Sequence, residues 1–345
     1  MNNDILIVTH SGDLHADLVI ERLRARHARA FRLDLDRFPV DYRIDVKQLD
    51  VTQLDTRPHD GAPIGTLRHL PSGAEVALAT IGAVWTRKAG DFRFPSDDEF
   101  GPQERAYAIA ETQHILTGLL LSLDAYWMNH PMTSNGAKWK GEQLRRASRM
   151  GFRVPPSLAS NDGDAVRRFR AAFGDIIFKP LSSPSLGADE VAPADRIVPN
   201  LATTLITDEH DAMLDAVCEL PGFFQQYIAK RHEIRATVIG DRVFAARIES
   251  QGDARTRIDY RDFSAEVEYR AERLPEAIER RCLAFVHGYG LTFGAIDLIF
   301  TPDGEYVFLE NNPAGQFLFV EQLVPELRML DAVADCLVDG ARRRG

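Results

Sequence analysis

The spacing of apolar and polar residues at the start of the chain is typical of an α/β protein. Residues 5–8 form a short apolar run, and residues 10–17 are polar and include Gly12. Residues 18–29 have helical spacing, and residues 30–35 alternate as a strand does. A strand, a loop, a helix and a second strand in this order predict an α/β domain with a parallel sheet.

The segments that follow, up to Pro131, are less regular in their spacing of apolar and polar residues. Residues 49–73 contain several Gly, Pro, Asp and Thr residues and predict turns and short strands. Residues 83–85 predict a strand, and residues 104–123 predict a long helix. Pro131 disfavours helix at the residue before it, so we expect the first domain to end there.

The middle of the chain contains residues that commonly begin or end helices. A helix is expected over residues 135–150, closed by Gly151. A second helix, capped by residues 160–162, should run to Phe173. A strand over residues 175–180 contains Lys179 near its end, and a Ser-, Pro- and Gly-rich loop follows at 181–187.

Two further strands surround Gly240-Asp241, a dipeptide typical of a type II′ hairpin turn. Glu233 and Arg235 alternate on the first of these strands and should share a face, whereas Arg247 should point to the other face. The preceding segment 223–228 predicts a strand that ends near Ile228. Three domains are therefore expected, at residues 1–130, 131–228 and 229–345.

The sharpest pattern lies near the C-terminus, where two β-rich runs flank Asp303-Gly304. If these two residues form the turn, Asp297 lies opposite Glu310, and Asn312 lies on the same face. Like charges opposite each other destabilise a sheet, so their presence among apolar residues indicates a bound cation. Oxygen ligands without His or Cys favour Mg²⁺. The alternative is a solvated strand face that carries acids.

Composition narrows the class of protein. The chain has 345 residues, 45% of them hydrophobic and 27% charged, which is typical of a folded protein and excludes disorder. Its 41 basic and 51 acidic side chains give a net charge of −10, which argues against nonspecific nucleic-acid binding. The three scattered cysteines, expected to be buried thiols, form no disulfide framework or zinc motif. No apolar run is long enough for a membrane span, and a cytoplasmic protein is expected.

Several familiar motifs are absent or weak. The first strand is not followed by GxGxxG, and GxxxxGK[ST] does not occur, so neither a dinucleotide fingerprint nor a P-loop is predicted. Lys140 and Lys179 are candidate phosphate ligands, although surface roles would explain each one alone. Asp13 and His15 form a D-x-H sequence that fits either a metal site or, as we favour, a loop that begins a helix.

The order of these features resembles the ATP-grasp superfamily. A helix lysine, a strand lysine, Gln-Tyr-Ile at 226–228, Glu-Ile-Arg at 233–235, Asp297 and Glu-Asn-Asn-Pro at 310–313 follow one another. Residues 9–17, 32–39, 83–88 and 143–155 are similar to a narrower group, the microviridin-type (graspetide) peptide macrocyclases. Tyr260 stands where this group often has Trp, and Glu-Asn-Asn-Pro replaces the commoner Glu-Val-Asn-Pro.

The resemblance implies an ATP-grasp fold with an N-terminal pre-ATP-grasp α/β domain, and it assigns roles to individual residues. Lys140 and Lys179 would contact the ATP phosphates, and Arg235 and Arg261 would face the phosphate or the activated carboxylate. Adenine would bind at Gln226, Tyr227 and Ile228, the ribose at Glu233, and two Mg²⁺ ions at Asp297, Glu310 and Asn312.

The activity implied by the resemblance is ATP-dependent ligation. Asp or Glu side chains of a precursor peptide, with leader and core, would be activated as acyl phosphates and joined to Ser or Thr hydroxyls or to Lys amines. Two alternatives stay open: a glutamate-ligase-like enzyme that adds an amino acid to a protein or small carboxylate, and a non-catalytic ATP-binding regulator. A homodimer is also left open, and no membrane partner is expected.

Overall fold

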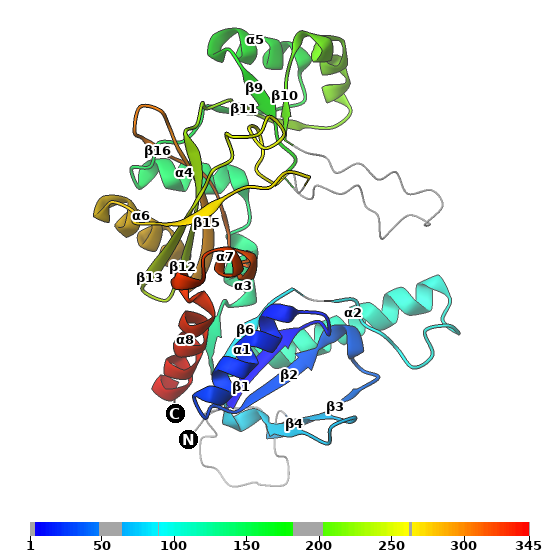
Figure 1. Cartoon of the computed structure of the whole chain (residues 1–345). Helices are drawn as coiled ribbons and strands as arrows, with labels where there is room; N and C mark the ends of the chain where they lie inside the picture. The colour runs from blue at the N-terminus through cyan, green and yellow to red at the C-terminus, as the bar shows by residue number, and fades with distance from the viewer. Residues whose placement is uncertain (1–3, 48–63, 89, 182–202, 262–263, 345) are drawn as a thin grey trace.

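The computed structural model describes residues 4–47, 64–88, 90–181, 203–261 and 264–344, and these form four β-sheets with flanking helices (Figure 1). In the view of Figure 1 the parallel N-terminal sheet lies at the bottom, a five-stranded sheet lies in the middle, and a smaller antiparallel sheet lies at the top. The expected mixture of helices and strands is confirmed. The predicted loop at 181–187 lies almost wholly outside the described residues.

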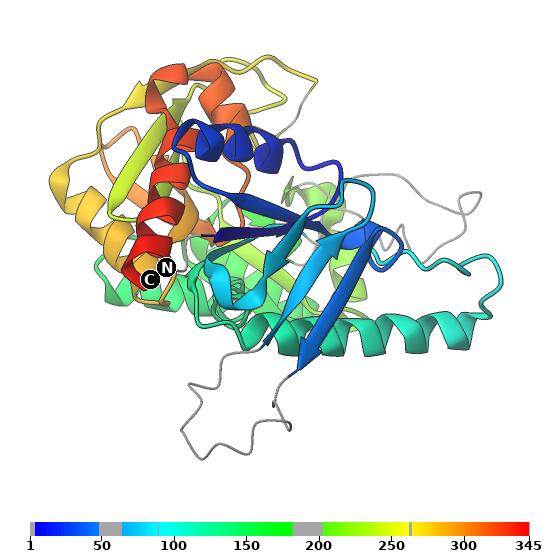
Figure 2. The same cartoon turned by 90° about the horizontal axis from the view of Figure 1, so that it is seen from below.

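The N-terminal sheet is parallel and is covered on both faces (Figure 2). Its strands, in spatial order, are β2 (Ala30–Asp34), β1 (Asp4–Thr9), β6 (Ile81–Thr86) and β7 (Tyr126–Met128). One face packs on α1 (Leu14–Ala25) and α8 (Met329–Arg344). The other face packs on the end of α2 (Pro102–Leu121) and on a small antiparallel sheet, β3 (Tyr42–Lys47), β4 (Ile64–His69) and β5 (Glu75–Ala77). Burial on both sides explains the continuous apolar run of β1.

The last helix of the chain returns to this first sheet. α8 packs beside α1 and against β6 and β7. Arg26, directly after α1, forms ion pairs with Asp331 (3.0 Å) and Asp335 (2.6 Å) of α8. The two ends of the chain therefore lie close together (Figures 1 and 2). The three domain ranges given above stay a prediction, and α8 is the part of the third range that contacts the first.

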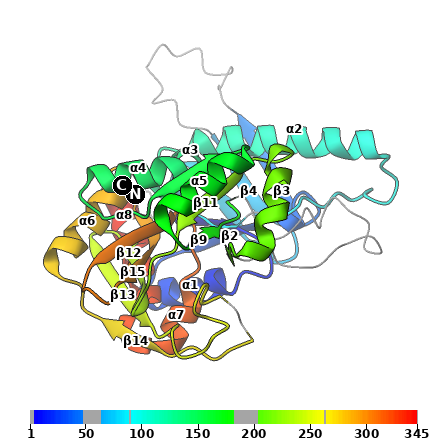
Figure 3. The same ribbon diagram turned by 90° about the horizontal axis from the view of Figure 1, so that it is seen from above.

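The four-stranded antiparallel sheet at the top of Figure 1 lies under α5 (Gly163–Phe173) when the molecule is viewed from above (Figure 3). Its strands, in spatial order, are β10 (Thr204–Leu205), β9 (Ile176–Phe178), β11 (Gly222–Gln226) and β8 (Ser157–Ser160). The Asp162 side chain accepts the N–H of Asp164 at the start of α5, and Gly174 (φ 76°) ends it, as the sequence predicts. A 3₁₀ segment, Asp208–Cys218, packs beside this helix.

The five-stranded sheet is antiparallel. Its strands, in spatial order, are β14 (Tyr269–Glu272), β13 (Arg242–Ile248), β12 (His232–Ile239), β15 (Phe293–Phe300) and β16 (Tyr306–Asn312). α4 (Lys140–Arg149) and α6 (Glu276–His287) pack on what we call the packed face, whereas the opposite face borders a cleft. Ile239 pairs with Arg242 across Gly240 (φ 58°), which confirms the predicted two-residue turn.

Two predicted helices have different limits in the structure. The helix expected at 135–150 is divided into α3 (Pro131–Gly136) and α4, because Trp139 adopts an extended conformation (ψ 107°) and the Gln143 side chain binds the Ala137 carbonyl (2.6 Å). The break places Lys140 at the first residue of α4. The helix expected at 18–29 begins at Leu14 instead, since the Asp13 side chain caps it, and α7 (Leu318–Leu323) is a short helix that the sequence did not reveal.

The cysteines and the absence of a membrane span complete the description. Cys282 is buried and Cys336 is half-buried beside Tyr126, but Cys218 is exposed at the end of its 3₁₀ segment. The expectation of buried thiols is therefore wrong for Cys218. Within the described ranges, every helix is too short or too polar to cross a bilayer.

Candidate active site

The hairpin β15–β16 brings the predicted carboxylates together. Asp297 lies opposite Glu310, and Ala295 lies opposite Asn312, so the predicted pairing is confirmed. Both acids belong to the face of the sheet that borders the cleft, and both are buried.

The turn of this hairpin differs from the prediction. Thr301 donates its N–H to the carbonyl of Glu305 (3.0 Å), and Gly304 has φ 84°, so the loop has one residue more than the two-residue turn expected. A β-bulge at Leu309 adds one residue to the second strand and restores the predicted pairing beyond it. Because of the bulge, the adjacent residues Leu309 and Glu310 both line the cleft.

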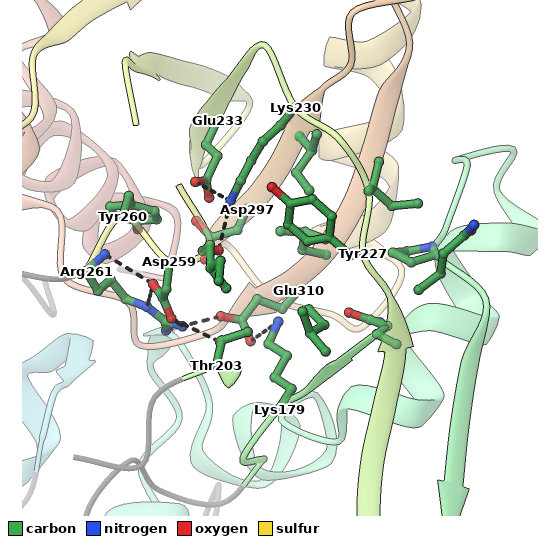
Figure 4. A pocket seen from close by; sticks show the side chains of 18 residues that line it. Lys179, Thr203, Tyr227, Lys230, Glu233, Asp259, Tyr260, Arg261, Asp297 and Glu310 are labelled. Carbon is green, nitrogen blue, oxygen red and sulfur yellow. Dashed lines mark hydrogen bonds and ion pairs between the residues drawn. The ribbon is translucent and has the colours of Figure 1, made fainter. Parts of the chain in front are cut away.

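Positive side chains surround Glu310. Lys140 Nζ lies 2.5 Å from its Oε2 atom. Lys179 Nζ lies 3.9 Å from the same atom, and Arg261 lies 3.9 Å from Oε1 (Figure 4). Burial alone would raise the pKa of Glu310, but the charges of Lys179 and Lys140 outweigh it and hold this pKa well below its usual range. Glu310 is therefore ionised at neutral pH.

Asp297 has a different environment. Arg235, in β12, places Nη1 3.1 and 3.2 Å from its two carboxylate oxygens. Burial and the charge of Glu310 nevertheless raise the pKa of Asp297 to about 6, against the effect of Arg235. Asp297 Oδ1 accepts no hydrogen bond from the described residues, and Arg235 Nε donates none. Asp297 Oδ1 can therefore still accept from or bind a further positive group, and Arg235 Nε can still donate to an anion.

The donor set fits Mg²⁺ but does not enclose it. Asn312 Oδ1 accepts from Lys140 (3.3 Å), and its Nδ2 is 3.5 Å from Glu310, so the amide lies beside the two carboxylates. Within the described part of the chain, no three His, Cys, Asp or Glu side chains gather with metal-binding geometry. Mg²⁺ commonly takes one or two carboxylates and completes its shell with waters and substrate phosphates. The carboxylates of Asp297 and Glu310 and the amide of Asn312 satisfy that habit.

A cleft of about 580 Å³ extends from these carboxylates between the five-stranded sheet and the sheet that contains β9 and β11 (Figure 4). Gln226, Tyr227 and Ile228 line it where the chain passes from one sheet to the other. The N–H groups of Gln226 and Tyr227 donate to Pro156 and Asp175. No described residue accepts the N–H of Ile228, so this group is the one available to a ligand.

The cleft unites the residues predicted for it. Lys179, Glu233 and Arg261 line it, while Lys140, Arg235 and Asn312 reach its carboxylate end through the contacts given above. Arg247 pairs with Ile234 on the packed face and forms an ion pair with Glu249 (2.6 Å), so it lies outside the site, as expected.

Several lining residues escaped the sequence analysis, among them Lys230, Asp259 and Thr203. Lys230 binds Glu233 (2.8 Å) and the carbonyl of Ile258 (2.9 Å), and it is buried. Asp259 binds Arg261 (2.7 Å) and accepts from Thr203 (3.1 Å). Hydrogen bonding to Arg261 outweighs the effect of burial and lowers the pKa of Asp259. The spacing of Asp259 and Arg261 was a usable signal, since an aspartate two residues before an arginine often fixes it.

A second, larger cavity of about 2660 Å³ adjoins the cleft, and Tyr260 and Arg261 line both. Basic residues dominate its wall, although the chain as a whole is acidic. Glu266 is the one acidic residue among the described residues that line it. The basic lining residues are Arg87, Lys88, Lys138, Arg235 and Arg261. A wall with this charge favours an acidic ligand.

Comparison with known proteins agrees with this geometry. A family model described as the MvdD pre-ATP grasp domain matches residues 4–135. The macrocyclase MdnC from Microcystis aeruginosa MRC, solved with the precursor peptide MdnA, is 30% identical, with 97% of this chain and 99% of that chain covered and a TM-score of 0.80. No curated protein sequence matches the chain.

Two other structures support the same assignment. A Chryseobacterium gregarium RiPP-associated ATP-grasp ligase, solved with ADP and a leader and core peptide, is 28% identical over 99% of this chain and 98% of that chain, with a TM-score of 0.85. The macrocyclase MdnB from Microcystis aeruginosa MRC is 28% identical over 97% and 99%, with a TM-score of 0.74. Fold and cleft thus define an ATP-grasp ligase. Within that class, the chain belongs to the graspetide-type ligases that act in ribosomal-peptide biosynthesis.

Proposed function

We propose that this enzyme uses ATP to activate Asp or Glu side chains of a ribosomally made precursor peptide and joins them to other side chains of the same peptide. The observation that carries this proposal is the shared wall at Tyr260 and Arg261. A nucleotide in the cleft would there meet a peptide carboxylate in the basic cavity. The related structures solved with ADP and with precursor peptides support this division.

The nucleotide would lie along the cleft with adenine at the hinge of Gln226, Tyr227 and Ile228. The free N–H of Ile228 would donate to the adenine ring, whose apolar faces fit Ile299 and Leu309. Glu233, held by Lys230, would accept a ribose hydroxyl. Lys140 and Lys179 would then reach the phosphates, since both already lie against the anionic Glu310.

Asp297, Glu310 and Asn312 would hold the Mg²⁺ ions that accompany ATP. When bound, Mg²⁺ neutralises charge that spreads over the transferring phosphoryl group. The residues of the chain do the remaining work. Arg235 keeps Asp297 ionised, and Arg261, fixed by Asp259, points its guanidinium at the border between the cleft and the cavity.

The reaction follows from this arrangement. A peptide carboxylate oxygen attacks the γ-phosphorus, the bond to the β-phosphate oxygen breaks, and ADP leaves. The acyl phosphate is then attacked by a hydroxyl or amine of the peptide, which loses its proton as inorganic phosphate departs. Ser and Thr hydroxyls would give an ω-ester, and Lys amines would give an ω-amide. Leader binding would keep the core at high effective concentration beside the basic cavity.

The decisive experiment combines the purified protein, ATP, Mg²⁺ and the peptide encoded beside its gene. Mass spectrometry should show products lighter by one water per linkage, together with ADP, and Glu310→Gln should abolish both. A mass gain would favour the amino-acid-adding alternative. An unchanged peptide mass without ADP would exclude the macrocyclase, and nucleotide binding without turnover would favour a regulator.

Hydroxylamine treatment of the product distinguishes the two linkages, because it cleaves esters and leaves amides intact. We also propose the cytoplasm as the site of action, where ATP and newly made peptide are both present. A homodimer stays a prediction that light scattering of the purified protein tests.

A further inference from the structure

The D-x-H sequence in the first loop has a structural role that the reaction above does not use. Asp13 caps α1 by accepting the N–H of His15 (3.1 Å), which confirms the loop and helix-start interpretation. No metal-binding group is found among the described residues, so the alternative interpretation has no support there. The His15 ring, however, also contacts residues 317 and 318.

The His15 ring accepts two backbone N–H groups from a distant part of the chain. Phe317 and Leu318 both donate to its Nε2 atom, at 3.3 and 3.2 Å, and the ring lies edge-on to that of Phe317 (4.9 Å between centroids). A nitrogen that accepts two N–H groups carries no proton. The proton of the neutral ring is therefore on Nδ1, which lies 3.4 Å from Asp13 Oδ1.

Asp13 is itself held on its other oxygen. Thr9 Oγ1 donates to Oδ2 (2.6 Å), and Arg87 Nε lies 3.2 Å from the same atom. Thr9 ends β1 and Arg87 directly follows β6, and the carboxylate and guanidinium are almost completely buried. The orientation of the His15 ring is thus fixed by the N-terminal sheet.

The segment that His15 holds forms part of the wall of the basic cavity. Phe319 and Leu323 of α7 line the cavity, as do residues 312–316 immediately before it. Arg87 lines the cavity from the other end of the same network. A displacement of Phe317 and Leu318 would therefore move the surface that faces the peptide, while the adenine end of the cleft has no contact with them.

We propose that His15 is a positioning residue for the peptide: as a neutral, Nδ1-protonated ring it holds the start of α7, and so the Phe319 and Leu323 wall of the cavity, against the N-terminal sheet. The part about peptide binding rests on the proposed function. The part about the ring and α7 does not, because it concerns contacts within the chain.

The network also predicts a response to acid. Burial lowers the pKa of His15, and the charges of Arg87 and Lys88 act in the same direction against the raising effect of Asp13. The ring is therefore neutral at pH 7 and protonates only at acidic pH. Protonation would put a hydrogen on Nε2, facing two N–H donors, and would break both bonds.

Three variants separate the contributions of the ring. His15→Phe keeps the aromatic contact with Phe317 but removes the acceptor, whereas His15→Gln provides a neutral acceptor that does not titrate. His114→Phe, at an exposed position of α2, is the matched control. We expect His15→Phe to raise the KM for the precursor peptide roughly tenfold, with the KM for ATP unchanged, because two hydrogen bonds are lost. His15→Gln should stay within about threefold of the wild type at pH 7.5, on the same scale of hydrogen-bond strength.

A readout without turnover tests the contact itself. Hydrogen exchange of residues 317–323 should be faster in His15→Phe than in the wild type and the His15→Gln and His114→Phe variants, and ¹⁵N spectra should show the Nδ1-protonated tautomer. As the pH falls through the range in which the ¹⁵N spectra show the ring gaining its second proton, the peptide KM should rise in the wild type and not in His15→Gln. Equal exchange in the wild type and His15→Phe, or the opposite tautomer, would overturn the proposal. So would equal impairment of His15→Phe and His15→Gln, or pH profiles that coincide across that range. If no peptide is modified, the exchange and tautomer results still decide the contact, and the proposed function alone fails.

Discussion

The two faces of the five-stranded sheet are built from the same strands, but one face carries buried charged side chains and the other carries mainly apolar ones. On the face that borders the cleft, Glu233, Arg235, Asp297 and Glu310 are buried, yet each has an opposite charge within 4 Å. On the packed face, Ile234, Ala236, Ile296, Leu298 and Phe308 form one apolar cluster with α4 and α6. Alternation along each strand thus separates binding from folding at neighbouring residues.

Two buried polar residues, Asn311 and His232, interrupt the apolar surface of the packed face. Asn311 is completely buried, and neither atom of its amide finds a hydrogen-bond partner among the described residues. His232 stacks on Phe300 (4.8 Å), and its Nδ1 atom is similarly unpaired. If the cleft face serves binding and the packed face serves folding, substitutions on the cleft face should alter activity and substitutions on the packed face should alter stability. Four experiments test this division.

The largest effect is expected for Glu310→Gln on the cleft face. Removing the charge that Lys140 and Lys179 surround should lower kcat by about 100- to 1000-fold, the range seen when a charge-stabilising group is lost. Single-turnover ADP formation measures it. The control is Glu305→Gln, the same change at an exposed position before β16. Comparable losses in both variants would contradict the assignment.

Leu298→Ala on the packed face should lower the free energy of unfolding by about 2 to 5 kcal/mol, because it leaves a cavity in a fully buried cluster. Urea titration followed by circular dichroism measures the loss. Leu220→Ala, at a position that is 73% exposed, should change stability little. If folded Leu298→Ala lost kcat as Glu310→Gln does, the two faces would not be separable.

Asn311→Val should stabilise the protein by about 1 to 3 kcal/mol, since it removes an amide buried without partners. The backbone contacts of residue 311 with Gln143 (2.8 and 2.9 Å) do not need the Asn side chain. Activity should therefore persist, while the urea midpoint rises. The exposed Asn161→Val is the control. A lower midpoint would show that the amide has a partner that the contacts do not reveal.

The smallest effect concerns pH. Burial, helped by the charge of Arg247, lowers the pKa of His232 to about 4, below the value of about 6.5 in an unfolded chain. Between these values the unfolded state binds the extra proton, so stability falls as the pH decreases. The loss from pH 7 to 5 should be about 1 to 2 kcal/mol. His232→Phe should remove that part of the pH dependence, whereas the exposed His114→Phe should retain it. Equal slopes in both variants would refute the assignment.

The pairing on the cleft face was predicted correctly, although the turn length assumed for it was wrong. The pairing of Asp297 with Glu310 is right, but the argument assumed a two-residue turn, and the real turn is one residue longer. The bulge at Leu309 compensates for it. Periodicity locates a strand and its faces, but it does not reveal where one strand gains a residue, because a bulge depends on the partner strand and on the cleft.

Contacts between segments that are distant in the sequence are the second reason why parts of the site could not be predicted. Lys140 was predicted inside a helix, and its place at the start of α4 depends on Gln143 binding the Ala137 carbonyl. Lys230, Asp259 and Thr203 belong to segments without periodic patterning and meet only in the folded chain. Single residues in such segments carry no local signal of their neighbours, whereas alternating strands and capped helices do.

The position of α8 has a consequence for how the molecule is made. The first strand leaves the ribosome early, but α8, which covers one face of its sheet beside α1, is translated after all the other described helices and strands. Domains generally fold as they are synthesised, from the N-terminus onward. Here the first sheet is completed only after α8 has been translated, and until then Ile5, Ile7 and Trp85 lack part of their cover. A complete N-terminal part therefore indicates that the strands of the active site have already been translated.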